Sequence, residues 1–462
     1  MIKFNKFKLE NGLEIYHVPV NPGSKVISVD VFYKVGSRNE VMGKSGIAHM
    51  LEHLNFKSTK NLRAGEFDEI VKGFGGVNNA STGFDYTHYF IKASNENLDK
   101  TLGLFAELMK NLSLKDKEFQ PEREVVHEER RWRTDNNPMG YLYFRLYNHA
   151  FIYHPYHWTP IGFIKDIESW KIADIKEFHA TYYQPKNAIL MISGDIGKDE
   201  AFKLAKKNFS SIKNKRAIPK LHCKEPEQDG ARRAIIYKDS QTQMLAIAYK
   251  IPDFRHADQV GLNAISEYLA TGKSSILQQR LVDELMLVNQ IYAYNMSCVD
   301  ENLFIFLAVC NPDVEASAVE AEILKIIDDL KRKPIDKEDV LRVKNLIKTD
   351  FIYSFESASK VANLYGSYLA RGDIKPLYEL EKNIEDALKE TDVKELQPGY
   401  LKSQLDESKD EIAKAGKELL TNPENSDKII DDLAKSLEKK AKNITDSVDK
   451  KTIQEEVYKN SD

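Results

Sequence analysis

The amino-acid sequence predicts a mixed protein, α+β or α/β, that is built as two halves of comparable size. Three observations lead to this prediction. Short runs that are typical of β-strands alternate with longer segments of helical character. A polar stretch without periodicity lies near the middle of the chain. The length of 462 residues is enough for several domains at roughly 100 to 200 residues each, so each half can bury its own core.

The expected strands are rich in β-branched and aromatic residues. In chain order the runs are VISVDVFYKVG from Val26, NAILMISGDI from Asn187, RAIIYKD from Arg233, QMLAIAYKIP from Gln243 and LFIFLAVC from Leu303. Residues 214–230 contain Pro219 and Pro226 and have no hydrophobic period. We therefore expect them to form the linker between the two halves.

The chain ends in a charged segment. Residues 401–462 contain 12 lysines and 15 acidic residues, and Tyr458 is their only aromatic residue. Apolar residues recur there at helical intervals, while Pro423 is expected to interrupt the helix. This composition predicts a solvated helical tail, or a partly disordered one, that contributes no core.

Charge and cysteine content exclude several classes of protein. The 67 basic and 71 acidic residues give a net charge of -4, so no basic surface for nucleic acid is expected. The cysteines, Cys223, Cys298 and Cys310, are too few and too irregularly spaced for a disulfide framework or a thiolate metal site. No signal peptide and no apolar run of about 18 residues is visible. We therefore expect a cytoplasmic protein with no nucleic-acid partner and no membrane partner.

The segment SGIAHMLEHLNF indicates a metal site. On a helical wheel its apolar residues fall on one side, and His49, Glu52 and His53 fall on the other. Two histidines four residues apart can bind one metal ion, and the glutamate before the second histidine lies beside that ion without binding it. This is the H-x-x-E-H arrangement of the inverzincins. The alternative interpretation is an ordinary exposed polar face of a helix.

Two histidines leave a tetrahedral zinc ion one protein ligand short, so another element has to supply a third. The segment PEREVVHEERRW offers several glutamates. Glu122 and Glu129 are two helical turns apart and share a face, whereas Glu128 is rotated about 100° from Glu129. From the residues alone, Glu122, Glu124, Glu128 and Glu129 stay open as candidates.

Six motifs follow one another along the chain: GSRNE, GIAHMLEHLNFKST, GGVNNASTGFDYTHY, EREVVHEE, HPYHWTPIG and YYQPKNAILMISGD. Taken together, they resemble one family, the pitrilysin or insulinase-type zinc peptidases (family M16). Within that family the chain is most similar to the half-length bacterial members and to the catalytic β subunit of mitochondrial processing peptidase. The resemblance runs in order from about residue 5 to 395.

The resemblance implies an α+β fold with two homologous mixed α/β-sheet domains. It places a catalytic zinc domain at residues 1–218 and a non-catalytic homologous domain at 219–396, followed by the charged helical tail at 397–462. The family closes its second domain with a final strand, and the charged tail contains no segment that would form one.

The resemblance also implies the roles of individual residues. His49 and His53 become ligands of one zinc ion per chain, and Glu129 becomes the third ligand. Glu52 becomes the catalytic base that deprotonates the attacking water, and Glu122 is a second acidic residue that supports the catalytic site.

The glycine pair before Val77 predicts a turn that leads into a strand. One interpretation of this segment is an ordinary hairpin without a function. In the family the matching strand is an open edge that binds the substrate peptide through backbone hydrogen bonds. By resemblance, the substrate-binding residues are Asn79, Ala80 and Ser81.

The second half departs from the family pattern in one respect. The family has an arginine and a tyrosine there that help to bind substrate, and the alignment puts Val282 and Asn289 at those positions. A shifted alignment would use Arg280 and Tyr292 instead. If the pair is absent, a homologous subunit has to supply it. We therefore expect a heterodimer, with a homodimer as the second choice, and weak activity of the isolated chain.

The function expected from these features is a zinc-dependent endopeptidase that hydrolyses unfolded peptides or small polypeptides in an enclosed chamber. Two alternatives share the fold. One is a non-catalytic structural subunit of a larger complex, and the other is a peptide-binding carrier without turnover. The complete His49, Glu52, His53 and Glu129 set favours the enzyme.

Overall fold

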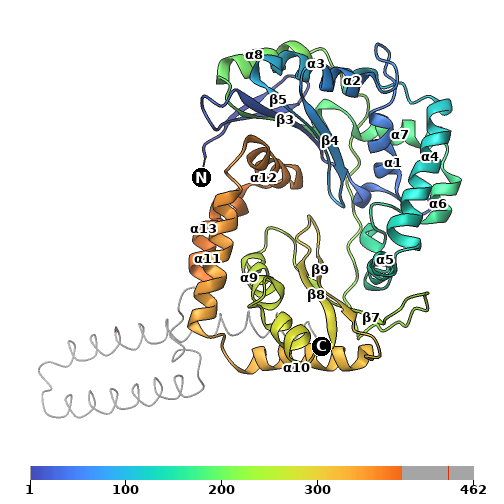
Figure 1. Ribbon diagram of the computed structural model, residues 1–462. Coiled ribbons are helices and arrows are strands. Elements are labelled where there is room, and N and C mark those ends of the chain that lie inside the picture. The colour runs from blue at the N-terminus through green and yellow to red at the C-terminus, as the bar shows by residue number, and fades with distance from the viewer. Residues whose placement is uncertain (1, 388–434, 436–462) are drawn as a thin grey trace, which may run out of the picture. The chain divides into compact units, whose positions relative to one another are not determined.

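The computed structural model describes residues 2–387 and Lys435, whose arrangement is shown in Figure 1. The chain divides into two compact units, and the larger one contains the chain up to Leu324 together with Val343–Asn383. The β-sheets of the described residues lie in this larger unit with helices packed on them. The α+β prediction is therefore confirmed.

The smaller unit contains Lys325–Arg342 and the residues from Ile384 onward. Its described part consists of the end of one helix, α10 (Ala316–Arg332), the beginning of the next, α11 (Lys337–Tyr353), the last residues of α13 (Lys375–Ala387), and Lys435. The predicted tail at 397–462 lies outside the described residues, except for Lys435.

A six-stranded sheet forms the centre of the first half of the chain. Its strands are β1 (Asn5–Lys8), β2 (Glu14–Pro19), β3 (Val26–Tyr33), β4 (Val77–Thr82), β5 (Thr87–Ser94) and β6 (Ala188–Gly194). The order is β1-β2-β6-β3-β5-β4, and neighbours are antiparallel except for the parallel pair β2 and β6. The sequence runs from Val26 and Asn187 form β3 and β6 as predicted, side by side in the sheet. β4 is an edge strand, since β5 is its partner among the described residues.

Helices and short turns connect these strands. The helices are α1 (Ile47–Asn55), α2 (Glu66–Gly73), α3 (Leu98–Asn111), α4 (Asp116–Arg130), α5 (Pro138–Ala150), α6 (Ile164–Ser169), α7 (Ile172–Tyr182) and α8 (Lys198–Phe209). A π-helical turn, Arg131–Asp135, follows α4 directly. Short 3-10 turns cover Ser37–Asn39, Asn95–Asn97, Pro155–His157 and Pro185–Asn187.

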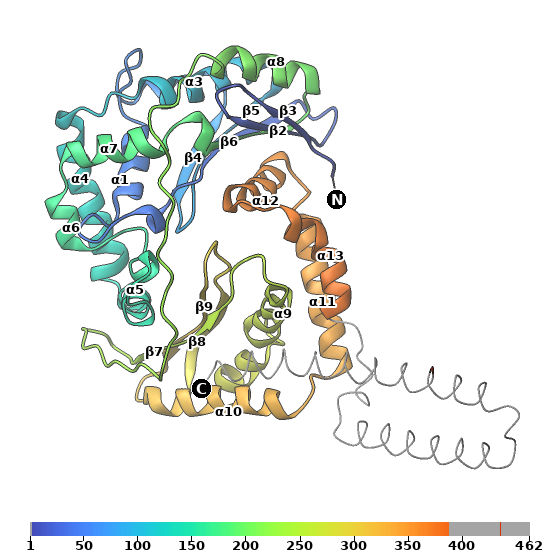
Figure 2. The same cartoon turned by 180° about the vertical axis from the view of Figure 1, so that it is seen from behind.

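Side chains of the sheet alternate between two cores, as the twofold period of a strand requires. On β3, Ile27, Val29 and Val31 belong to the main core, whereas Phe32 belongs to a second core on the opposite face. Figures 1 and 2 show α3 and α8 on the main-core side of the sheet. The sheet is therefore covered on both faces, which explains why its central strands are almost wholly apolar.

A helix from the second half of the chain covers the second face. It is α12 (Ala358–Arg371), which lies against β3 and β6 in Figure 1 and packs Val361 and Tyr365 into the second core. Gly366 allows this close approach, because a Cβ at that position would overlap the ring of Phe32. The packing of α12 was not predicted from the sequence. The next helix is α13 (Lys375–Ala387).

A three-stranded antiparallel sheet forms in the second half from β7 (Met244–Ile251), β8 (Val288–Asn295) and β9 (Asn302–Cys310). Its order, β7-β9-β8, repeats the order β3-β5-β4 of the first sheet. The runs from Gln243 and Leu303 form β7 and β9 as predicted. Helix α9 (Asp258–Ala270) and a π-helical segment, Gln278–Glu284, lie between β7 and β8 in the chain.

The strand predicted from Arg233 is wrong. Residues 231–240 contain no strand or helix, and the side chains of Ile235 and Tyr237 are 79% and 92% exposed. A strand needs a neighbouring edge for its backbone hydrogen bonds, and no described strand pairs with this run. The predicted linker at 214–230 likewise has no helix or strand.

The two halves of the chain share contacts inside the larger unit. Tyr147 of α5 donates a hydrogen bond of 3.1 Å to Asn302 of β9, and a common apolar cluster includes Phe151 and Ile305. The loop between β8 and β9 is also held, because Asp300 pairs with Arg38. The boundaries 1–218 and 219–396 stay a prediction.

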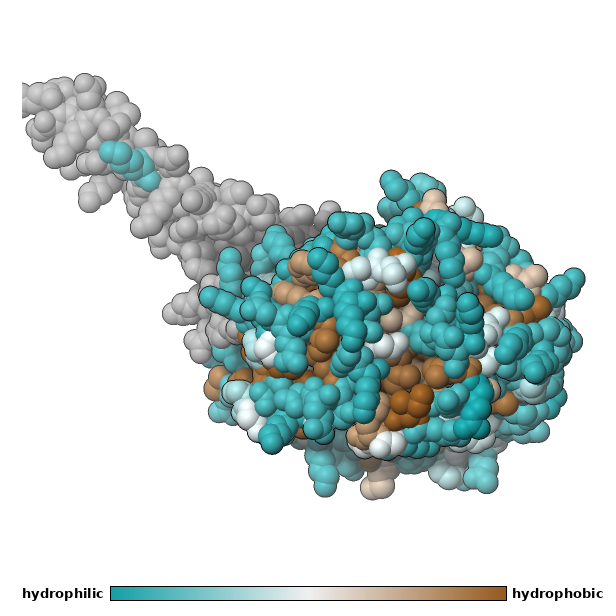
Figure 3. All heavy atoms as spheres, turned by 90° about the horizontal axis from the view of Figure 1, so that it is seen from above, coloured by the Kyte–Doolittle hydropathy of each residue, from teal (hydrophilic) through white to brown (hydrophobic). Residues whose placement is uncertain are grey.

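In the described part of the chain no helix is both long and apolar enough to cross a membrane. Figure 3 shows one face of the molecule, on which hydrophilic side chains predominate and apolar ones form smaller areas between them. The cytoplasmic location stays a prediction.

Candidate metal centre

Helix α1 presents the two histidines because its other side is anchored in the core. Met50 and Leu51 have no exposed surface, whereas His49 and His53 are only partly covered. This is the division of faces that the sequence predicts. The chain enters α1 at Gly46 with φ of 85°, and a Cβ there would lie 2.7 Å from a backbone oxygen, so glycine is required.

A buried carboxylate fixes the first turn of α1. Glu40 accepts hydrogen bonds of 2.8 Å from the backbone N–H groups of Gly46 and Ala48 and from Nε1 of Trp158. These bonds satisfy N–H groups that the start of a helix leaves open. Burial outweighs them and raises the pKa of Glu40 to about 8. Sequence reasoning assigned Glu40 no role, although the GSRNE motif contains it.

The structure brings His49, His53 and Glu129 together. One potential ligand atom from each residue lies within 4.8 Å of the other two. The Nε2 atoms of His49 and His53 lie 3.6 and 3.3 Å from Oε2 of Glu129. Over residues 2–387 and Lys435, these side chains form the one group of three or more His, Cys, Asp or Glu that could share a metal ion.

Glu129 is oriented by the π-helical turn that follows its helix. Arg133, one turn further on, binds Oε1 of Glu129 at 3.0 Å and leaves Oε2 directed at the histidines. The other open candidates point elsewhere: the side chains of Glu124 and Glu128 are 65% and 66% exposed, and Glu128 pairs with Arg131. Of the four glutamates, Glu122 and Glu129 therefore face the histidines.

Glu122 contacts the other side of His53. Its Oε1 lies 2.9 Å from Nδ1 of His53, and Lys57 binds its Oε2 at 2.5 Å. A proton on Nδ1 that is donated to Glu122 leaves the lone pair on Nε2 free for a metal ion. Nδ1 of His49, in contrast, is buried without a hydrogen-bond partner in the described structure.

The two imidazoles have opposite pKa shifts. Burial, together with the nearby His53, lowers the pKa of His49 to about 4, so its ring is neutral at pH 7. For His53 burial acts in the same direction, but the hydrogen bonds with Glu122 and Glu129 outweigh it and raise the pKa to about 9. A metal ion that binds Nε2 of His53 therefore has to displace a proton.

Glu52 lies on the same face of α1 but outside the cluster. Burial raises its pKa, and a hydrogen bond from the hydroxyl of Thr82 acts against that rise. Glu52 is thus held by the last residue of β4. Sequence reasoning missed Thr82, which the quoted GGVNNASTGFDYTHY motif contains without any feature that marks it.

The predicted substrate-binding residues Asn79, Ala80 and Ser81 lie on the edge strand β4. The backbone N–H of Ala80 donates to the side-chain oxygen of Asn79 at 2.9 Å.

The alternative pair, Arg280 and Tyr292, is engaged elsewhere. Arg280 binds Glu284 at 2.8 Å and Glu322 at 3.3 Å. Tyr292 lies on β8, donates to Gln290 at 3.1 Å and stacks on a neighbouring tyrosine. Among the contacts described for these two residues, none reaches the metal cluster.

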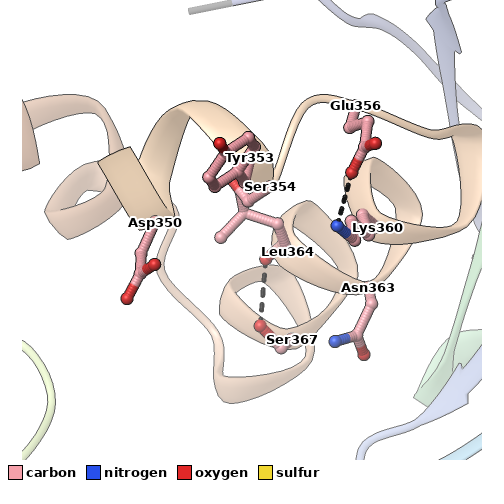
Figure 4. Close-up of a pocket in the computed structure, with 8 residues that line it drawn as sticks. All are labelled: Asp350, Tyr353, Ser354, Glu356, Lys360, Asn363, Leu364 and Ser367. Carbon is pink, nitrogen blue, oxygen red and sulfur yellow. Dashed lines mark hydrogen bonds and ion pairs between the residues drawn. The ribbon is translucent and has the colours of Figure 1, made fainter. Parts of the chain in front are cut away.

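A shallow cleft of about 640 Å³ lies at the end of α11 and along α12, and Figure 4 shows its lining. Within it Lys360 pairs with Glu356 at 2.7 Å. No residue of the metal cluster lines this cleft, so we assign it no role. It is lined by Asp350, Tyr353, Ser354, Glu356, Lys360, Asn363, Leu364 and Ser367.

The donor set fits a catalytic zinc ion. Two imidazole nitrogens and one carboxylate oxygen converge from two helices. A tetrahedral zinc ion held by these three residues would keep one position for water or substrate. A second glutamate, Glu52, lies beside the set on the same helix face as the histidines. Fold and donor set thus define a protein of the metallopeptidase class.

Comparison with known proteins identifies the family. The model "Insulinase (Peptidase family M16)" matches residues 18–156, and "Peptidase M16 inactive domain" matches residues 169–347. The chain is 54% identical over 403 residues to "Zinc protease PqqE" of Helicobacter pylori, which covers 87% of this chain and 90% of that one. The chain therefore belongs to peptidase family M16 and is a metallopeptidase of that type.

Two further relatives agree with this. The β subunit of mitochondrial processing peptidase of Mus musculus is 26% identical over 400 residues, which cover 83% of this chain and 79% of that one. The crystal structure of a protease from Helicobacter pylori matches with a TM-score of 0.82 at 53% identity, over 84% of this chain and 95% of that one.

Glu122→Gln is expected to lower zinc affinity by about 10- to 100-fold, because the neutral amide supports the His53 imidazole less well than a carboxylate does. Competition with a chelating dye measures the affinity. Glu124→Gln is the matched control, since its side chain is 65% exposed on the same helix. Equal zinc affinity of the Glu122→Gln variant and the wild type would contradict the supporting role.

Proposed function

We propose that the protein is a zinc-dependent endopeptidase that hydrolyses unfolded peptides or small polypeptides. The observation that carries the proposal is the convergence of His49, His53 and Glu129, with Glu52 beside them. Membership of family M16 and the relatives named zinc proteases support zinc as the metal.

In this proposal His49, His53 and Glu129 hold one zinc ion per chain. When bound, zinc lowers the pKa of water and polarises the scissile carbonyl. Glu52 accepts the proton of the attacking water and returns it to the leaving amine. Burial raises the pKa of Glu52, which makes its carboxylate a stronger base for this exchange. Glu122 holds the proton on Nδ1 of His53, which keeps the ring in the ligating tautomer.

The edge position of β4 supports an extended peptide as the substrate. An added strand would pair with backbone groups of β4 such as the N–H of Ala80. Asn79 and Ser81 would flank that contact. A folded protein cannot present an extended segment to an edge strand without opening, so unfolded chains are the preferred substrates.

Ala80→Pro is expected to lower kcat/KM for peptides by about 10-fold or more, because it removes one backbone hydrogen bond to the substrate. The N–H that is lost donates to the side chain of Asn79 in the structure, and β4 is an edge strand, where proline is tolerated. Circular dichroism checks the fold, and Ala80→Val adds side-chain volume while it keeps the donor. A kcat/KM for Ala80→Pro no lower than that for Ala80→Val would rule out the edge-strand contact.

We further propose that a homologous subunit supplies the missing arginine and tyrosine and completes an enclosed chamber as a heterodimer. Two observations support this proposal. The guanidinium of Arg280 is already paired with Glu284 and Glu322, and the chain is similar to a β subunit of mitochondrial processing peptidase. A homodimer is the second choice. The purified chain alone is then folded and zinc-loaded but weakly active, and sedimentation with and without a candidate subunit tests the assembly.

The experiment that tests the function is degradation of a mixed peptide library, read by mass spectrometry. The expected result is cleavage that stops with a chelator and returns when zinc is added back. Metal analysis of the same sample should give about one zinc ion per chain. Cleavage that persists in protein shown to be free of metal would refute a zinc peptidase.

A further inference from the structure

The hydroxyl of Thr82 is bound to the carboxylate of Glu52. Its Oγ1 donates a hydrogen bond to Oε2 of Glu52. Glu52 belongs to α1, the helix of the two histidines, and Thr82 is the last residue of the edge strand β4. The contact therefore joins the helix of the candidate metal centre to the strand expected to bind substrate.

The alternation of β4 directs Thr82 toward α1. Along the strand, exposed and partly buried residues alternate, with Ser81 on the exposed side and Ala80 and Thr82 on the covered side. Ala80 packs against the main core, to which α1 also contributes. The side chain of Thr82 therefore lies on the covered face of β4, where its hydroxyl reaches Glu52.

One hydrogen bond is enough to orient this carboxylate. The last torsion of a glutamate side chain is broad, so a free carboxylate samples many orientations. With Oε2 held by Thr82, the plane of the group is fixed and Oε1 is left to accept a proton. Hydrogen bonds to ionised groups are stronger than those between neutral groups, which makes Thr82 an effective restraint.

We propose that Thr82 is a positioning residue that fixes the carboxylate of Glu52 and links its orientation to the strand on which the substrate peptide lies. The inference rests on the proposed function, in which Glu52 is the general base. It goes beyond that function because it assigns a role to a residue of the substrate strand that does not touch the reacting atoms.

The test compares Thr82→Val, which removes the hydroxyl and keeps the shape, with Thr82→Ser, which keeps the hydroxyl. For Thr82→Val we expect kcat to fall about 10- to 100-fold at unchanged KM, because the hydrogen bond orients the base without binding substrate. Thr82→Ser is expected to recover most of the loss. Thr101→Val is the matched control, since the hydroxyl of Thr101 is buried without a partner and lies in α3.

Two measurements besides activity separate positioning from a general structural effect. Zinc content and the circular dichroism spectrum of Thr82→Val should equal those of the wild type. A crystal structure of Thr82→Val should show the Glu52 carboxylate rotated or in several orientations, while α1 and β4 stay in place. A carboxylate that keeps its wild-type orientation would overturn the inference.

The kinetic measurements also test the positioning role of Thr82. Wild-type kcat in Thr82→Val, or equal losses in Thr82→Val and Thr82→Ser, would overturn the positioning role. Glu52→Gln separates this from the proposed function. If Glu52→Gln still hydrolyses peptides at the wild-type rate, the proposed function fails. If Glu52→Gln is inactive and Thr82→Val has wild-type kcat, only the role of Thr82 fails.

Discussion

Glu52→Gln is expected to lower kcat by about 10²- to 10⁴-fold, the range over which a general base contributes to catalysis. Glutamine has nearly the same shape and can still accept the hydrogen bond from Thr82. It cannot take a proton from water at neutral pH. Zinc content should stay at about one ion per chain, because Glu52 lies outside the His49, His53 and Glu129 group.

The measurements are peptide hydrolysis and metal analysis on the same preparation. Glu124→Gln serves as the control for the chemical change, since its side chain is 65% exposed. Loss of zinc from Glu52→Gln would place the residue among the ligands and contradict its role as base. Undiminished hydrolysis would remove it from the mechanism altogether.

Glu129→Ala is expected to lower zinc affinity by more than about 100-fold and to abolish hydrolysis. Removing a ligand should cost more than removing a residue that only supports one, for which the loss is about 10- to 100-fold. The neighbouring Glu128→Ala is the matched control. Its side chain is 66% exposed and pairs with Arg131 at 2.7 Å, so it should retain both zinc and activity.

Metal analysis after dialysis against a weak chelator measures the difference between the two variants. Glu128 and Glu129 are neighbours in the sequence, and their side chains point about 100° apart around the helix. Full zinc occupancy in Glu129→Ala, or its loss in Glu128→Ala, would show that the geometry of the cluster misidentifies the third ligand.

The sequence by itself predicted the features that depend on local periodicity. The helical period of SGIAHMLEHLNF separates an apolar side from a side with His49, Glu52 and His53, and α1 is buried in that way. The runs that became β3, β6, β7 and β9 were also recognisable, because their composition suits a buried sheet. These features need little information about distant parts of the chain.

Other features depend on which segments meet in space. RAIIYKD has the composition of a strand but is not one, because no described strand offers it an edge. The contact of α12 with β3 joins segments more than 300 residues apart, and it depends on the second core and on the fit of Gly366 against Phe32. Residue composition cannot specify such a pairing.

The candidate metal centre divides in the same way. The sequence determined the two histidines and Glu52, because their spacing on one helix fixes which face they share. From the residues alone the third ligand stayed open, and the family resemblance indicated Glu129. The tertiary structure shows that Glu129, and not Glu128, faces the histidines, because this depends on the rotation of α4 relative to α1. The hydrogen bond from Thr82 to Glu52 likewise depends on packing. The two residues lie on different elements, β4 and α1, and no periodic pattern in the sequence indicates that they are in contact.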